Sequence, residues 1–466
     1  MVFSSATFLC FFLPAVLLLS RWIRPLRAQN GLLLIASLVF YAFGRLGWLP
    51  ILLVSAAVSW AGGRLVVRPG RVGRCALVGA LTVHLAILFA FKYVDFALSI
   101  VNAVCGTAFA PTGIALPVGI SFFTFQGMSY VIDVSRDHRQ SCRSYARVLL
   151  YLALFPQLVA GPIVQYRDIA DQFDHRAVTP EGTTSGLVRF TVGLSKKLLL
   201  ANALGQAADA VYALAPGQLD CPLAWLGAVC YTLQIYFDFS GYSDMAIGLG
   251  RVFGFRIREN FLHPYTAASI KVFWRRWHVS LSSWFRDYVY IPLGGNRHGA
   301  ARARANRLFV FFLTGLWHGA NWTFVCWGLW HGLLLLVEDL LRLDRRLPRP
   351  IGHVYTMLAV TLGFMLFRAE SLGQAGAFLA AMFGGAARTA ESIALLAGLC
   401  DPILVTALVA GGVCALPLGD WLRRAAERRG RTIPDAVVLP GTLVLLAIDL
   451  MVLAASSFNP FIYFQF

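Results

Sequence analysis

Two histidines stand in segments that are unusually apolar for an ionisable side chain. His278 lies in FWRRWHVSLSSWFRDY and His318 in LWHGANWTF, each directly after a tryptophan. Burying an ionisable group in such surroundings costs free energy, so it is a functional candidate by default. An imidazole can take up and release a proton near neutral pH. The pair therefore indicates acid–base chemistry inside a bilayer.

The spacing of residues 273–287 predicts a helix with an aromatic face and a polar face. Trp274, His278, Leu281 and Phe285 recur at helical intervals and would share one face. The polar side chains on another face are Arg276, Ser280, Ser283 and Asp287. A histidine that is merely packed and hydrogen-bonded at an interface is an alternative that this spacing leaves open.

The tripeptide Trp-His-Gly occurs twice in residues 311–332 and introduces a third histidine. His318 and His331 are 13 residues apart (331 − 318). On one straight helix this separation is about 20 Å of rise and roughly 220° of rotation. Either the helix bends or only one of the two is catalytic. The glycine after each histidine would let backbone or a ligand approach closely, whereas an interfacial aromatic belt is the alternative explanation for the tryptophans.

A group of polar residues interrupts the apolar pattern near position 240. Its members are Asp238, Ser240, Tyr242, Ser243 and Asp244. The two carboxylates could orient or charge-balance a histidine, or bind a cation. Capping of a helix at the cytoplasmic boundary explains them equally well.

Composition predicts an all-α polytopic membrane protein. Of the 466 residues 58% are hydrophobic, and the mean hydropathy is +0.67. Apolar runs near the ~20 residues that cross a bilayer lie at 31–58, 75–100, 145–164, 185–208, 222–250, 308–340, 352–367, 402–418 and 435–457. Allowing for paired or broken helices, we expect roughly 10–12 spans and no separate soluble domain. In the first apolar segment the basic residues follow the apolar stretch, which predicts a membrane helix with its N-terminus outside rather than a cleavable signal.

The net charge of +17 has the distribution of a membrane protein. The arginines cluster in short loops: Arg21, Arg24 and Arg27; Arg64, Arg68, Arg71 and Arg74; Arg136, Arg139 and Arg143; Arg342, Arg345, Arg346 and Arg349; Arg423, Arg424, Arg428, Arg429 and Arg431. This is the positive-inside pattern. Anionic lipid headgroups account for it, and the exposed aromatic and basic surface that binds nucleic acid is absent.

Several familiar sites are missing from the sequence. The nine cysteines are scattered without a CxxC pair, so we expect neither a metal site nor a disulfide framework. The sequence has no GxxxxGK[ST] phosphate loop and no HExxH zinc motif. It also has no GxSxG nucleophile elbow.

Three stretches break the rhythm of spans and loops. Pro117 and Gly119 interrupt an apolar run in 111–137, and prolines and glycines make a continuous helix improbable in 155–176. Irregular backbone at membrane depth must be buried in protein or line a cavity, so we expect a cavity, a re-entrant segment or a plain kink there. The third stretch, 236–307, is too long for an ordinary loop and predicts amphipathic or re-entrant helices at the cytoplasmic interface.

Seven segments carry a resemblance to a known family. They are LPVGISFFTFQGMSYVIDV at 116–134, FPQLVAGPIVQY at 155–166, QIYFDFSGYSDMAIGLGRVFGF at 234–255, ENFLHPY at 259–265, FWRRWHVSLSSWFRDYVYIPLGGNRHG at 273–299, GLWHGANWTFVCWGLWHG at 315–332 and FNPFIYFQF at 458–466. In these motifs the chain resembles the membrane-bound O-acyltransferases (MBOAT). Within that superfamily it is similar to the bacterial subfamily of the alginate O-acetyltransferase membrane subunit. The N-terminal part and residues 340–440 match by hydropathy more than by motif.

The resemblance implies a fold and assigns the site. The fold would be a ring of tilted helices around a thinned membrane, pierced by a tunnel, with 1–466 as one domain and its catalytic core at about 111–340. His318 corresponds to the catalytic histidine and His278 to its upstream partner, while the role of His331 is not given. Candidate substrate-binding residues in these motifs are Trp274, Trp277, Arg276, Asp238, Tyr242, Trp317 and Asn321.

The implied activity is acetyl transfer from a cytosolic donor, expected to be acetyl-CoA, with no bound cofactor. His318 would take the proton of an attacking hydroxyl. His278 would hydrogen-bond the thioester carbonyl or hold His318 in the right tautomer. Coenzyme A phosphates would be attracted by cytoplasmic basic residues, namely Arg275, Arg276, Arg286 and Arg297, although positive-inside topology also explains each of them.

The same resemblance implies a place and partners. The protein would lie in the bacterial inner membrane and serve an exopolysaccharide or cell-wall glycan, together with a periplasmic acetyl-transfer partner protein. One alternative is transfer of another acyl group, D-alanyl or fatty acyl, by the same fold. Another is a secondary transporter with Asp238 and Asp244 as coupling sites, but we find no repeated halves with matching broken helices.

Overall fold

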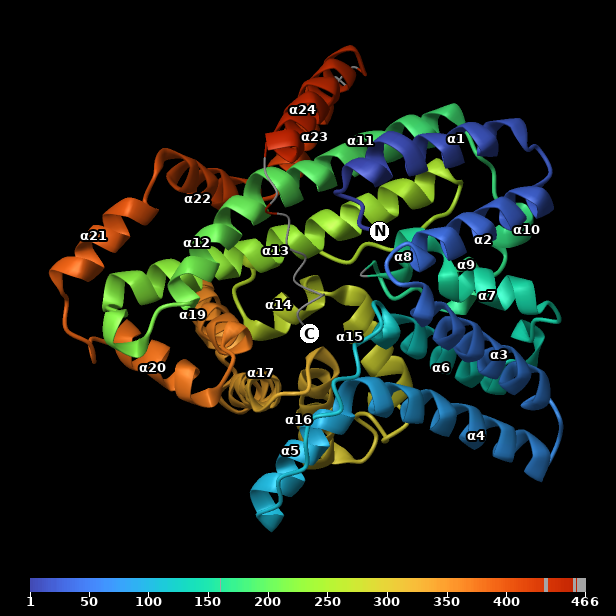
Figure 1. Ribbon diagram of the computed structural model, residues 1–466, viewed down its shortest axis with the longest axis horizontal. Helices are drawn as coiled ribbons and strands as arrows, with labels where there is room; N and C mark the ends of the chain where they lie inside the picture. The colour runs from blue at the N-terminus through green and yellow to red at the C-terminus, as the bar shows by residue number, and fades with distance from the viewer. Residues whose placement is uncertain (160, 431–434, 456–457, 459–466) are drawn as a thin grey trace. The chain divides into compact units, whose positions relative to one another are not determined.

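The computed structural model describes residues 1–159, 161–430, 435–455 and 458. All regular secondary structure in this part of the chain is helical (Figure 1), as the composition predicts. Ala160, Arg431 and residues 459–466 of the last motif lie outside the described residues. The chain divides into one unit of Met1–Phe190 and Ser243–Glu259 and a second unit of Thr191–Tyr242 and Asn260–Phe466.

The first unit is formed by the N-terminal helices. They are η1 (Phe8–Phe12), α1 (Leu13–Trp22), α2 (Leu26–Ala42), η2 (Leu46–Trp48), α3 (Leu49–Leu65), α4 (Arg71–Leu88), η3 (Phe89–Tyr93), α5 (Val94–Cys105), α6 (Ile120–Arg136), η4 (His138–Gln140), α7 (Tyr145–Ala153), α8 (Phe155–Leu158), α9 (Tyr166–Ile169) and α10 (Gln172–His175). Two long helices, α11 (Pro180–Ser195) and α13 (Cys221–Val252), contribute residues to both units.

The second unit contains the three histidines of interest. Its helices are η5 (Lys196–Ala201), α12 (Asn202–Tyr212), η6 (Pro216–Gln218), η7 (Pro264–Thr266), α14 (Ile270–Arg276), α15 (Val279–Phe285), η8 (Arg286–Tyr290), α16 (Gly299–His318), α17 (Trp322–Leu341), α18 (Leu343–Arg346), α19 (Arg349–Arg368), α20 (Leu372–Met382), α21 (Ala390–Leu399), α22 (Pro402–Cys414), α23 (Leu418–Arg428) and α24 (Asp435–Ala455).

Several helices are long and apolar enough to cross a membrane. In the described part of the chain these are Leu46–Leu65, Arg71–Cys105, Trp322–Leu341, Arg349–Arg368 and Ala436–Ala455, and the bent pair Ala390–Leu399 and Pro402–Cys414 would add a sixth span. They confirm a polytopic membrane protein. Fewer spans meet this test than the 10–12 expected, because other apolar helices such as Phe8–Trp22 and Leu26–Ala42 are short. The higher number stays a prediction.

A buried histidine links the helices of the first unit. His84 on α4 is fully buried, and its Nδ1 and Nε2 lie 3.3 and 3.0 Å from the hydroxyls of Ser55 and Ser59 on α3. Ser59 already donates its hydroxyl hydrogen to the carbonyl of Ser55, so Nε2–H of His84 must donate to Ser59. A polar side chain in an apolar helix is thereby satisfied by its neighbours, as burial requires.

The predicted interruptions lie where proline and glycine occur. Residues 106–118 before α6 form no helix. Gly119 has φ +75°, and a Cβ there would lie 2.5 Å from the carbonyl oxygen of Leu158. The described residues between 155 and 166 are buried and only partly helical, and Tyr151 on α7 donates to the carbonyl of Val164 at 2.8 Å. This irregular backbone is therefore enclosed by protein, as membrane depth demands.

Two expected spans and the long polar stretch are arranged differently from the prediction. The run 31–58 is divided between α2 and α3, and the run 308–340 between α16 and α17. The stretch 236–307 does contain the expected short helices, α14 and α15, but its first residues belong to the interior of α13. Apolar composition does not mark these helix ends, because turn residues between two apolar helices can be apolar too.

Helices α16 and α17 form a tight hairpin in the second unit (Figure 1). Gly315 and Gly328 face each other, and a Cβ on Gly328 would lie 3.1 Å from the Cα of Gly315 and 2.3 Å from the carbonyl oxygen of Phe311. Small residues allow such close approach of membrane helices. The two glycines therefore set the distance between the helices that carry His318 and His331.

Replacing Gly328 tests this contact. We expect Gly328→Ala to destabilise the protein by roughly 1–3 kcal/mol, because the added methyl group must push the backbones apart. Gly376→Ala on α20 is the matched control, since nothing lies within 4 Å of its Cβ position; it should be neutral or slightly stabilising. Thermal denaturation in detergent measures both variants, and equal stability of the two would contradict the close packing.

Candidate active site

His318 is the last residue of α16, where the hairpin turns. Gly319 is extended, and α17 begins after Asn321, whose side-chain oxygen accepts a hydrogen bond from the backbone N–H of Thr323 at 3.2 Å. His318 is 5% exposed. The ring lies edge-to-face against Trp317 and Trp327, with centroids 5.0 Å away in both cases, and against Phe367 at 5.2 Å.

The helix predicted for 273–287 is wrong at its centre. α14 ends at Arg276 and α15 begins at Val279, because His278 adopts a left-handed conformation with φ 43° and ψ 55°. A non-glycine residue rarely adopts this conformation, which interrupts a helix. His278 is 2% exposed and packs against Phe239 at 6.4 Å and Phe261 at 6.1 Å.

The local backbone determines which nitrogen of His278 carries hydrogen. The N–H of Leu281 donates to His278 Nδ1 at 3.4 Å, so the ring caps the helix that follows it. A neutral imidazole has one N–H, so an accepting Nδ1 leaves the hydrogen on Nε2. His278 lies outside the helices that are long enough to span a membrane, and its burial lowers its pKa to about 3 because the charged form loses its water. At neutral pH His278 is therefore a neutral hydrogen-bond donor through Nε2.

Trp317 brings the two predicted histidines together. Its indole lies 6.1 Å from the ring of His278 and 5.0 Å from that of His318, edge-to-face in both cases. The pair singled out from the sequence therefore meets at one aromatic side chain. Their catalytic roles stay a prediction.

The break between α16 and α17 resolves the geometry of the doubled motif. His331 lies on α17 and not on the helix of His318. It is fully buried, 5.2 Å from Trp327 and 5.2 Å from Trp274. Among the described residues neither of its ring nitrogens has a hydrogen-bond partner. Because Trp327 also contacts His318, the two histidines share one indole as a neighbour.

The carboxylates near position 240 pair with basic side chains. Asp238 lies 2.6 Å from Nζ of Lys197, and Asp244 accepts hydrogen bonds from Arg189 at 2.8 and 3.0 Å. Both lie in the interior of α13, so neither caps a helix as one prediction held. Tyr242 is buried on the same helix. These ion pairs favour a structural role for the two carboxylates over a role in binding substrate.

The other predicted site residues form the walls of this region. Trp277 stacks at 5.5 Å on Phe273 and contacts Phe261 at 5.0 Å. Arg276 donates to the hydroxyl of Thr266 at 2.6 Å. Asn321 donates to the carbonyl of Glu370 at 2.8 Å and accepts from the N–H of Thr323, so these contacts hold the hairpin turn.

Sequence reasoning missed several residues that enclose the histidines. Phe239, Phe367 and Trp327 surround the rings. Asn260, in ENFLHPY, hydrogen-bonds the start of α15. The motifs contained all but Phe367, yet nothing in the spacing distinguishes an aromatic residue that faces a histidine from one that faces lipid.

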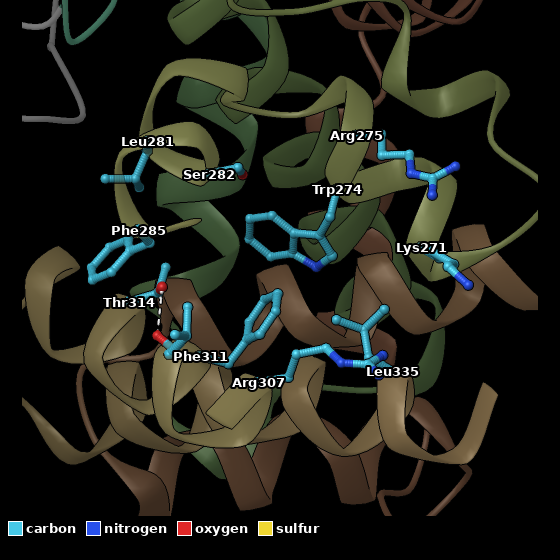
Figure 2. A pocket seen from close by; sticks show the side chains of 11 residues that line it. Lys271, Trp274, Arg275, Leu281, Ser282, Phe285, Arg307, Phe311, Thr314 and Leu335 are labelled. Atoms are coloured by element: carbon cyan, nitrogen blue, oxygen red, sulfur yellow. Dashed lines mark hydrogen bonds between the residues drawn. The ribbon is translucent and has the colours of Figure 1, made fainter. Parts of the chain in front are cut away.

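A cavity of about 260 Å³ lies among α14, α15, α16 and α17. In Figure 2 the cationic groups of Lys271, Arg275 and Arg307 lie to one side of Trp274, and Leu281 and Phe285 lie to the other. The remaining lining residues are Ser282, Val310, Phe311, Thr314 and Leu335. Asp339 pairs with both Arg307 and Lys271, whereas Arg275 is exposed and has no ion pair within the described part of the chain.

The comparisons with known proteins identify the family. Residues 81–369 match the model of the membrane-bound O-acyltransferase (MBOAT) family, and all three histidines fall within that match. The chain belongs to the membrane-bound O-acyltransferases. This acyltransferase is 41% identical to a protein of Azotobacter vinelandii described as "probable alginate O-acetylase AlgI", with both chains covered completely.

Two further relatives extend the comparison. The chain is 31% identical to a peptidoglycan O-acetyltransferase of Helicobacter pylori over 100% of this chain and 98% of the relative. It is 28% identical to a teichoic acid D-alanyltransferase of Bacillus subtilis, over 53% of this chain and 65% of the relative. Membership of the family replaces the secondary-transporter alternative, so this chain is a multi-pass membrane acyltransferase.

Two substitutions of His278 test its function as a donor. His278→Ala removes the Nε2–H, and we expect kcat for acyl transfer to fall roughly 10²–10³-fold, as for loss of one oxyanion donor. Asparagine tolerates the left-handed conformation and is a preferred helix cap. His278→Asn should therefore retain clearly more activity than His278→Ala. Steady-state kinetics of purified protein in nanodiscs measure both, and wild-type activity of His278→Ala would exclude the donor role.

Proposed function

We propose that this acyltransferase is an inner-membrane enzyme that moves acetyl groups from cytosolic acetyl-CoA towards the periplasm for O-acetylation of an exported polysaccharide. The observation that carries the proposal is the contact of His278 and His318 with one indole, Trp317, in a buried aromatic enclosure. The relatives that match the whole chain are described as alginate and peptidoglycan O-acetylating proteins.

The residues fit a direct transfer step. The acceptor hydroxyl attacks the thioester carbonyl carbon while His318 takes its proton, and Nε2–H of His278 donates to the carbonyl oxygen as negative charge develops there. The C–S bond then breaks, the acetyl group remains on the acceptor oxygen, and the thiolate of coenzyme A leaves with the proton from His318. A donor fixed in a dry enclosure stabilises that charge more strongly than water does.

The cavity beside Trp274 fits the donor in this scheme. Phosphate groups of coenzyme A would lie near Lys271, Arg275 and Arg307. The arm of coenzyme A that carries the thioester would pass along the apolar lining of the cavity. Ring contacts continue from Trp274 to Trp327 at 5.7 Å and from Trp327 to His318 at 5.0 Å. The cavity of about 260 Å³ is close to the lower end of the range of ligand pockets, about 300–1,000 Å³.

The acceptor follows from the relatives named above. A hydroxyl of an alginate-like exopolysaccharide or of peptidoglycan is the final acceptor that their descriptions support. We also propose that a periplasmic partner protein receives the acetyl group and completes the transfer, as the subfamily resemblance implies. Transfer of D-alanine is the alternative outcome, since D-alanyltransferases match about half of the chain.

Labelled donors test the function. Protein in proteoliposomes should release free coenzyme A from acetyl-CoA and label the partner protein or a glycan acceptor, whereas palmitoyl-CoA and a D-alanyl carrier should not act as donors. We expect His318→Ala to lose at least roughly 10²-fold in rate, because the general base is gone. His353→Ala, a partly buried histidine that contacts the carbonyl of Ala267, should retain wild-type activity. Full activity of His318→Ala, or label from D-alanine alone, would refute the proposal.

Charge reversal at the cavity tests the donor site. We expect Arg275→Glu to raise KM for acetyl-CoA about tenfold, which corresponds to ~1.4 kcal/mol, and to leave kcat nearly unchanged. Arg68→Glu changes the net charge equally at an exposed position of the first unit and should leave KM as it is. The same KM for acetyl-CoA in both variants would show that the donor does not bind in this cavity.

A further inference from the structure

The start of α15 contains an unusual set of hydrogen bonds. The first N–H groups of a helix have no partner within the helix, and those of Val279, Ser280 and Leu281 are each satisfied from outside it. Asn260 supplies two of the three acceptors. Its carbonyl oxygen accepts from Val279 at 3.0 Å, and its side-chain Oδ1 accepts from the N–H of Ser280 at 3.1 Å.

The remaining acceptor is the ring of His278 itself. The N–H of Leu281 donates to His278 Nδ1 at 3.4 Å. The hydroxyl of Ser280, which lies 3.4 Å from the same nitrogen, donates instead to Oδ1 of Asn260 at 2.9 Å. Asn260 Oδ1 thus holds both donors of Ser280, and the Leu281 N–H is directed to His278 Nδ1.

The same loop holds the other side of the turn. The N–H of Leu262 donates to the carbonyl of Arg276 at 2.9 Å. The ring of Phe261 contacts Trp277 at 5.0 Å and His278 at 6.1 Å. Residues 260–262 therefore hydrogen-bond the backbone on both sides of His278. These bonds stabilise its left-handed conformation, which is unfavourable for a non-glycine residue.

We propose that Asn260 is a positioning residue that fixes the ring orientation and the Nε2–H tautomer of His278. The inference rests on the proposed function of His278 as a hydrogen-bond donor. Asn260 is itself 2% exposed, and its carbonyl and side-chain oxygens accept hydrogen bonds from Val279 and Ser280, the two residues that follow His278. Its effect on the reaction therefore passes through His278.

Kinetics of a double-mutant cycle separate positioning from general stability. We expect Asn260→Ala to lower kcat roughly 10–100-fold with little change in KM, as displacement of a donor by about 1 Å does. Asn260→Asp retains both acceptors and should recover most of the rate. In a His278→Ala background, Asn260→Ala should cost little more, because residues that act through one another are not additive. Additive losses would overturn the proposal.

Asn306→Ala is the matched control. Asn306 is 5% exposed and donates to the carbonyls of Leu293 and Gly295. The Asn306→Ala variant should lower stability as Asn260→Ala does but leave kcat unchanged. A loss of kcat equal to that of Asn260→Ala would show that any buried asparagine of this unit has the effect, and would overturn the proposal.

A second readout needs no substrate. In histidine-labelled protein, ¹⁵N NMR distinguishes a bare ring nitrogen from a protonated one, and His278→Ala assigns the resonance. We expect a bare Nδ1 in the wild type and a mixture of tautomers in Asn260→Ala. An unchanged spectrum would overturn the positioning role. If the spectrum changes but the wild type transfers no acetyl group, the positioning of His278 stands and the proposed function fails.

Discussion

Backbone contact between α16 and α17 at Gly315 and Gly328 sets the geometry on which the second unit depends. The contact is close enough that a single methyl group has no room, so the hairpin can be neither wider nor shifted without losing it. His318 therefore lies at the end of one helix and Trp327 and His331 lie on the facing one. The aromatic enclosure of His318 follows from this pairing rather than from any contact the histidine makes itself.

The enclosure combines apolar burial with hydrogen bonds to the first backbone N–H groups of α15, where the chain turns. Rings that meet edge-to-face pack densely and exclude water, and this strengthens any interaction between dipoles inside. At His278 the backbone requirement and the proposed chemistry involve one ring, because the Nδ1 that caps α15 leaves the Nε2–H as the donor. The capping of α15 thus determines which nitrogen of the ring is left to donate.

Much of this could be predicted from the sequence, and the limits are physical. Apolar composition gave the helical membrane fold, and the rarity of buried imidazoles pointed to His278 and His318. The helix predicted through His278 was wrong because periodicity reports which residues share a face, and a single left-handed residue leaves that pattern unchanged. Asp238 and Asp244 could not be assigned, because their partners Lys197 and Arg189 lie about 40 and 55 residues away in the chain and only the fold brings them together. Asn260 carried no signal of its own, since an amide that accepts backbone hydrogen bonds looks like any polar loop residue.

The position of His318 as the final residue of α16 has an electrical consequence. The carbonyl ends of α16 point towards that terminus, where the aligned peptide dipoles amount to about half a negative charge. A cation at such a terminus is stabilised by roughly 0.3–1 kcal/mol, and by up to about 2 kcal/mol where water is partly excluded. If His318 takes a proton as proposed, the resulting imidazolium would gain this stabilisation. As the proposed base, His318 would thus receive from α16 a stabilisation of the same sign as the one that an aspartate gives to the histidine in many soluble hydrolases.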